Sequence, residues 1–185
     1  WLFRRSETTF GWLALSSLLW ILFISNVLTT ENFPFHSTIS AAKANMLFFI
    51  AYIHCFCLYL IRFVKQKFKQ LERGFILVSV LSSLLVMISS LDYLEQVLGG
   101  VFIIYVLLFI SCTVYVSYQA IKTRNGEYLF LTLCLWGILL CVVIDLIMLN
   151  QTQVNEFSPL SPYTSPIITL FVVLIMGTRL NRNVR

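Results

Sequence analysis

Charged residues are scarce in this chain of 185 residues, since only 11% of the residues are charged and 59% are hydrophobic. A soluble globular domain usually carries about 25% charged residues, because its surface faces water. So little charge excludes an ordinary soluble fold. The mean hydropathy of +0.88 indicates instead that lipid is the solvent for most of the surface.

Residues that carry metal or nucleophilic chemistry are also few. The only histidines are His36 and His54, and the chain has no HxxxH or CxxC spacing, so no metal, haem or other cofactor is predicted. The sequence lacks a glycine-rich phosphate loop, paired intramembrane carboxylates and a serine–histidine–acid arrangement, so this segment is not expected to be an enzyme. All the cysteines fall inside apolar runs, which favours buried thiols over a disulfide framework.

Six apolar runs are long enough to cross a bilayer, because a helix needs roughly 20 residues to span about 30 Å of hydrocarbon. Lipid cannot hydrogen-bond a free peptide group, so these runs must be helical, and the absence of period-two alternation excludes a β-barrel. The fold class predicted for residues 1–185 is therefore all-α, a single polytopic transmembrane helical bundle. The expected spans are 10–28, 44–64, 74–91, 98–120, 128–149 and 163–180.

Lysine and arginine are confined to alternate connections between these runs, with Lys43 as the single exception. The basic residues on the favoured side are Arg4, Arg5, Arg62, Lys65, Lys67, Lys69, Arg73, Lys122, Arg124, Arg179, Arg182 and Arg185. Because basic residues resist translocation, this split predicts that both ends of the chain are cytoplasmic. The net charge of +5 does not indicate a nucleic-acid partner, since the basic residues do not gather on one polar segment.

Asp145 is the one acidic residue deep in an apolar run. A carboxylate there costs on the order of 3 kcal/mol, so it is expected to face the bundle or a water-filled pocket. One interpretation is a group that responds to protons or to a ligand. The alternative is a structural carboxyl that is hydrogen-bonded to a neighbouring side chain or lies close to the outer interface near Asn150.

His54 and Tyr105 are two further polar residues within apolar runs. His54 stands beside Cys55, but adjacent helix positions point about 100° apart, so the two side chains cannot easily share one metal ion. A neutral histidine packed against a polar neighbour is therefore favoured over a ligand. Tyr105 contributes to a partly polar face of the fourth run. Together with Asp145, these residues are the candidates for intramembrane sensing.

A family resemblance rests on both ends of the chain. The first residues, Trp1-Leu2-Phe3-Arg4-Arg5-Ser6-Glu7, lead into an apolar run, and the last apolar run is followed by Arg179-Leu180-Asn181-Arg182-Asn183-Val184-Arg185. With the helix count, short loops and topology, this pattern resembles the membrane region of bacterial seven-transmembrane receptors with diverse intracellular signalling modules (7TMR-DISM). The resemblance covers essentially the whole chain. It implies that the chain is a piece of a longer protein and holds helices two to seven.

The resemblance also implies a function and a location. The chain is expected to lie in the bacterial inner membrane and to couple an external or intramembrane stimulus to a cytoplasmic histidine kinase or diguanylate cyclase domain. Arg179, Arg182 and Arg185 would mark the output end of the last helix, and the protein would form a homodimer through those cytoplasmic domains. The ligand is unknown. The alternative is a small transporter or permease subunit, which predicts polar residues converging from several helices and helices broken by glycine or proline.

Overall fold

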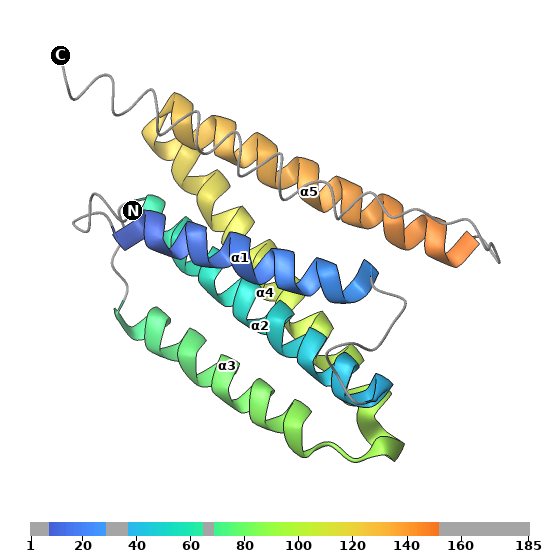
Figure 1. The fold of residues 1–185 in the computed structure, drawn as a ribbon. Coiled ribbons are helices and arrows are strands. Elements are labelled where there is room, and N and C mark those ends of the chain that lie inside the picture. The colour runs from blue at the N-terminus through green and yellow to red at the C-terminus, as the bar shows by residue number, and fades with distance from the viewer. Residues whose placement is uncertain (1–7, 29–36, 65–68, 152–185) are drawn as a thin grey trace. The chain divides into compact units, whose positions relative to one another are not determined.

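The computed structural model describes residues 8–28, 37–64 and 69–151, and every regular element in these ranges is helical (Figure 1). The elements are α1 (Thr8–Leu28), α2 (Thr38–Phe63), α3 (Lys69–Ile88), the short 3-10 helix η1 (Leu91–Tyr93), α4 (Leu94–Thr123) and α5 (Gly126–Gln151). The all-α prediction is confirmed for the part of the chain that the structure describes.

Four segments are long and apolar enough to cross a membrane, namely Thr38–Phe63, Lys69–Ile88, Leu91–Thr123 and Gly126–Ile144. Helix α1 contributes a shorter apolar stretch, Gly11–Ser25. The chain is therefore a helical membrane protein. The expected span 163–180 lies outside the described residues, so the total of six spans stays a prediction.

Each described helix begins before the apolar run that predicted it, but α3 ends at Ile88, three residues before the expected end of the span 74–91. Helix α2 begins at Thr38 rather than near residue 44, because Ser37 and Ser40 form a capping box in which each side chain accepts the other's backbone N–H at 3.2 Å. Lys43, assigned from the sequence to a connection, therefore lies inside α2. The apolar runs predicted where helices lie but not where they begin, because a helix continues into polar sequence when a cap satisfies the backbone groups at its end.

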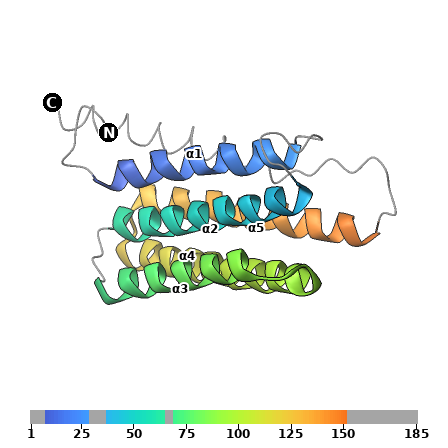
Figure 2. The ribbon, with the colours of Figure 1, turned by 60° about the horizontal axis from the view of Figure 1, so that its bottom comes forward.

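The described chain divides into two units, Trp1–Cys112 and Thr113–Arg185. In the first unit, α2 is the central helix and lies between α1 and α3 (Figure 2). From Phe49 to Val64 almost every side chain of α2 is buried, with partial exposure only at Ala51, His54 and Arg62.

Aromatic pairs join α2 to its neighbours in this unit. Tyr52 meets Trp20 of α1 with 4.8 Å between ring centroids. Phe49 and Phe56 stack on Phe102 and Phe109 of α4 at 5.2 and 5.9 Å. The two stacked pairs are spaced by one heptad on both helices, which is the pattern of parallel helices packed side by side.

The second unit holds the end of α4 and all of α5, joined by a tight connection. Arg124 adopts φ 50°, the left-handed conformation that commonly ends a helix. The Asn125 side chain then accepts the backbone N–H of Glu127 at 3.0 Å and caps the start of α5. Trp136 Nε1 donates to Ser117 Oγ at 3.1 Å and ties α5 back to α4.

Candidate functional site

Polar contacts join α2 and α3 at three levels along their length. We call them the polar seam: Lys43 with the carbonyls of Met87 and Ser89, His54 with Ser79, and Arg62 with Glu72. Residue numbers rise along α2 and fall along α3 from one contact to the next, as antiparallel helices require. Many large side chains of α3 are exposed, Leu77 by 60% and Leu81 by 57%, so polar contacts are a large part of what holds α3 against α2.

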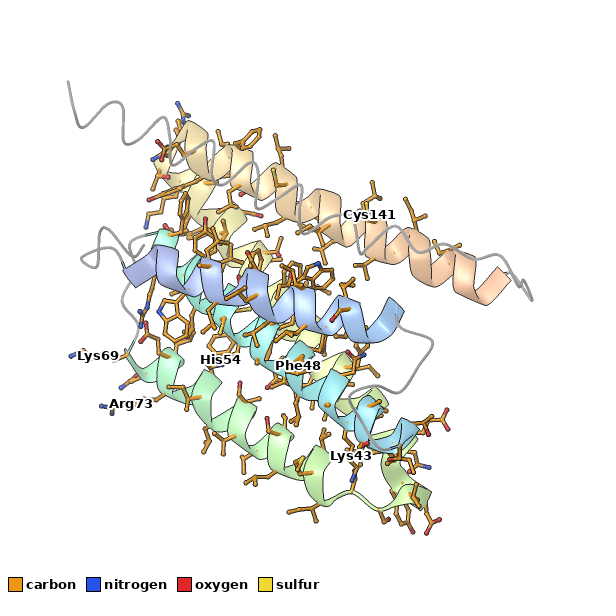
Figure 3. All side chains as sticks on the ribbon, viewed as in Figure 1. Lys43, Phe48, His54, Lys69, Arg73 and Cys141 are labelled. Carbon is orange, nitrogen blue, oxygen red and sulfur yellow. The ribbon has the colours of Figure 1, made fainter. Side chains whose placement is uncertain are left out.

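The middle of the polar seam is a hydrogen-bond chain through three helices, which we call the central chain. His54 Nδ1 lies 2.8 Å from Ser79 Oγ of α3, and Tyr105 Oη of α4 donates to the same oxygen at 3.2 Å. The Phe75 ring meets the imidazole edge-on, with 6.3 Å between ring centroids. Figure 3 shows His54 in the space between α2 and α3. Tyr105 is only 1% exposed, whereas His54 and Ser79 are half-buried, so the Tyr105 end of this chain is the one sheltered from the surface.

The central chain has two hydrogen-bond arrangements, because a serine hydroxyl both donates and accepts. With a neutral imidazole that carries its proton on Nε2, Ser79 accepts from Tyr105 and donates its own proton to His54 Nδ1. A protonated His54 carries a proton on Nδ1, so Ser79 then accepts from both neighbours and must turn its own proton elsewhere. Protonation of this tautomer of His54 therefore reverses the direction of the hydrogen bond between His54 and Ser79.

Lys43 forms one end of the polar seam. Its Nζ donates to the Met87 carbonyl at 3.1 Å and to the Ser89 carbonyl at 2.8 Å. Both carbonyls lie at the C-terminal end of α3, where a helix leaves acceptors unpaired and concentrates negative partial charge. The labelled Lys43 side chain reaches from α2 towards this end of α3 (Figure 3). One cation thereby fixes the end of α3 to α2.

Arg62 forms the other end of the polar seam. Its guanidinium makes two parallel hydrogen bonds to Glu72, Nε to Oε1 and Nη2 to Oε2, both at 3.1 Å. The same guanidinium lies over the Trp12 ring of α1, with 5.3 Å from Cζ to the ring centroid. Arg62 therefore binds a carboxylate on α3 and an aromatic face on α1 at once, which suits a planar guanidinium better than an ammonium.

Two of the three polar residues selected from the sequence meet in this site. His54 and Tyr105 are joined through Ser79, and His54 has the polar neighbour that was expected of it. Asp145 belongs to α5, but its side chain lies outside the described residues. The output-end residues Arg179, Arg182 and Arg185 lie outside the described residues altogether.

Sequence reasoning missed Ser79, Lys43, Arg62 and Glu72 as members of the site. Ser79 resembles any serine in an apolar run, so nothing marked it. Lys43 did carry a signal, since it was the one basic residue that broke the alternation of the connections. Glu72 carried one as well, because it is the only acid in the basic stretch from Arg62 to Arg73.

Within residues 8–28, 37–64 and 69–151, no group of three His, Cys, Asp or Glu side chains is placed to hold a metal ion. All five cysteines belong to these ranges and are free thiols.

Four helices that are long and apolar enough to cross a membrane define the class of protein, a polytopic helical membrane protein. The sequence matches no protein-family model, and comparison with curated proteins and with solved structures finds no match.

Proposed function

We propose that this chain is the membrane-embedded sensory and signal-transmission region of a bacterial receptor of the sensor histidine kinase or diguanylate cyclase type. The observation that carries the proposal is the central chain, in which His54, Ser79 and Tyr105 join α2, α3 and α4. A change at any one of these groups alters the contacts of three helices together. Transmission needs such a local event, one that biases the packing of several elements.

The energies involved are of the size that a switch between two packing states requires. A hydrogen bond between membrane helices contributes about 0.6 to 2 kcal/mol. Coupling between two sites of a receptor typically amounts to about 1–3 kcal/mol. Rearranging one or two bonds of the central chain therefore supplies an energy of the size that signalling requires.

The proposal extends to parts of the chain beyond the described residues. Six spans place both ends of the chain on the cytoplasmic side of the bacterial inner membrane. Displacement of α3 or α4 passes to a last helix at 163–180, and Arg179, Arg182 and Arg185 begin the connection to the output domain. That domain also supplies the contacts of a homodimer, and the stimulus is an unidentified ligand or a state of the membrane.

A transporter or permease subunit is the second candidate, and one observation favours it. Polar side chains from three helices converge at the central chain, as a substrate site between helices requires. The described helices, however, run unbroken through their glycines, including Gly99 and Gly100 in α4 and Gly137 in α5. Broken helices are what exposes backbone groups to a transported ion, so the receptor is the better supported function.

The test replaces Ser79 with alanine in the full-length gene product expressed in native membranes. Phosphorylation from labelled ATP and formation of cyclic dinucleotide are measured on those membranes, and solute uptake is measured in vesicles. The Ser79→Ala variant is expected to change the signalling output by about fivefold or more, because it removes the atom shared by both bonds of the central chain.

Ser83→Ala is the matched control, since Ser83 lies one turn further along α3 and belongs to no contact of the polar seam. The control is expected to keep the output of the unmodified protein. The transporter is the correct function if the membranes show neither phosphorylation nor cyclic dinucleotide formation and the Ser79→Ala variant abolishes solute uptake.

A further inference from the structure

Helix α3 has an outward face that is charged at one end and apolar along the rest. Six exposed residues recur every three or four positions and so share one side of the helix. They are Lys69, Arg73, Ile76, Val80, Leu84 and Met87. We call this set the outer face of α3. Glu72 and Ser79, which contact α2, lie about a quarter of a turn around the helix from this face.

The charged end of the outer face has no partner in the described part of the chain. Lys69 and Arg73 stand one turn apart, and no ion pair joins either of them to a described residue. The nearest acid along the helix, Glu72, is already held by both hydrogen bonds from Arg62. Figure 3 shows the labelled Lys69 and Arg73 side chains extending away from the bundle at one end of α3. Among the described residues, both positive charges therefore lack an acidic partner and can pair with an external anion.

The apolar part of the outer face has the length of one acyl chain. Ile76 is 52% exposed, and Val80 and Leu84 are each 51% exposed. At about 1.5 Å per residue, the segment from Arg73 to Leu84 rises about 16 Å. Half of the hydrocarbon core is about 15 Å thick, so this segment reaches from the level of the headgroups to the middle of the bilayer.

We infer that the outer face of α3 binds an anionic phospholipid, with the phosphate between Lys69 and Arg73 and an acyl chain along Ile76, Val80 and Leu84. Arginine pairs with phosphate through parallel hydrogen bonds, and lysine adds a point charge. Charge complementarity favours this occupant over a second copy of the chain. Two parallel copies joined through this face would bring their lysine and arginine side chains together, and like charges repel.

The experiment measures lipid binding by the purified full-length protein in neutral detergent, using native mass spectrometry and titration with phosphatidylglycerol or phosphatidylcholine. Tight binding of phosphatidylglycerol alone is expected. The double variant Lys69→Gln/Arg73→Gln is expected to weaken that binding about 25-fold, because each of the two basic residues near an anionic lipid contributes roughly a fivefold effect. Unchanged binding in this variant would refute the site.

Two matched variants separate the site from general charge and from misfolding. Lys122→Gln/Arg124→Gln removes the same charge from two exposed residues at the α4–α5 connection, and it is expected to bind as the unmodified protein does. Lys69→Arg/Arg73→Lys keeps the charge and is expected to retain binding. The inference is overturned if Lys122→Gln/Arg124→Gln weakens phosphatidylglycerol binding as much as Lys69→Gln/Arg73→Gln does. It is also overturned if Lys69→Arg/Arg73→Lys loses this binding completely.

A third arm identifies the source of the phosphate. Inorganic phosphate at millimolar concentration is expected not to displace phosphatidylglycerol, because the acyl chain supplies part of the binding. Displacement of phosphatidylglycerol by inorganic phosphate overturns the inference. So does a dimer that the Lys69→Gln/Arg73→Gln variant strengthens, because a second copy of the chain would then occupy the face. None of these readouts depends on signalling, so they stand apart from the proposed function.

Discussion

Tyr105 is the residue at which the central chain can be tested with the smallest chemical change. Tyr105→Phe removes only the hydroxyl that donates to Ser79 and leaves the buried ring in place. The expected loss of stability is about 1 kcal/mol, since neither partner is left charged and the ring packing is kept. The unfolding temperature of the purified protein is expected to fall by about 2–4 °C, because this is the usual shift per kcal/mol for chains of this size.

The matched change for this prediction is Tyr118→Phe in the same helix. Tyr118 is 59% exposed, so loss of its hydroxyl is expected to leave the unfolding temperature unchanged. Equal unfolding temperatures for Tyr105→Phe and the unmodified protein would show that the bond to Ser79 contributes nothing.

Single residues were predictable where they were out of place in their surroundings. His54 and Tyr105 stood out because a polar group in an apolar run is costly unless it finds a partner. The identity of that partner was not predictable, because a serine in a membrane helix usually bonds to its own backbone, as Ser111 does with the Leu107 carbonyl at 2.8 Å. Only the crossing of α2 and α3 distinguishes Ser79 from such serines.

At the scale of elements, the Arg62–Glu72 pair tests whether the polar seam aligns α2 with α3. The two side chains are 26% and 23% exposed, between a surface pair and a buried one. Glu72→Gln is therefore expected to destabilise the protein by about 1–2 kcal/mol, between the values for exposed and buried pairs. Chemical or thermal unfolding of the purified protein measures the change.

Charge reversal separates this pair from a general effect of charge. Arg62→Glu/Glu72→Arg is expected to recover most of the loss caused by either single reversal, because the two groups can pair in the opposite sense. Recovery stays incomplete, since a glutamate at position 62 cannot stack on the Trp12 ring. A double variant no more stable than the single reversals counts against the pair.

The existence of the helices was predictable, but their neighbours were not. Continuous apolar runs were enough to predict α2, α3, α4 and α5, because lipid allows no other backbone structure. Nothing in those runs marked α2 as the central helix of its unit. In water, a buried face is recognised by its apolar residues, whereas a lipid-facing surface is as apolar as the core, so the pattern does not separate inside from outside.

At the scale of the whole molecule, the open question is the number of spans, which decides where the chain delivers a signal. The alternation of basic connections predicts six spans, of which 163–180 lies outside the described residues. Fusions to alkaline phosphatase and to green fluorescent protein report the side of the membrane independently, because each is active on one side only. A fusion after Asp92 is expected to give phosphatase activity, and a fusion after Arg124 is expected to fluoresce.

The decisive fusion is placed after Arg185. If residues 163–180 cross the membrane, this fusion reports the same side as the one after Arg124, and fluorescence is expected. Arg179, Arg182 and Arg185 favour this outcome, because three arginines beside a span resist translocation. Phosphatase activity at Arg185 contradicts the sixth span and places the end of the chain outside. An intracellular kinase or cyclase could then no longer follow it, so this measurement also bears directly on the proposed function.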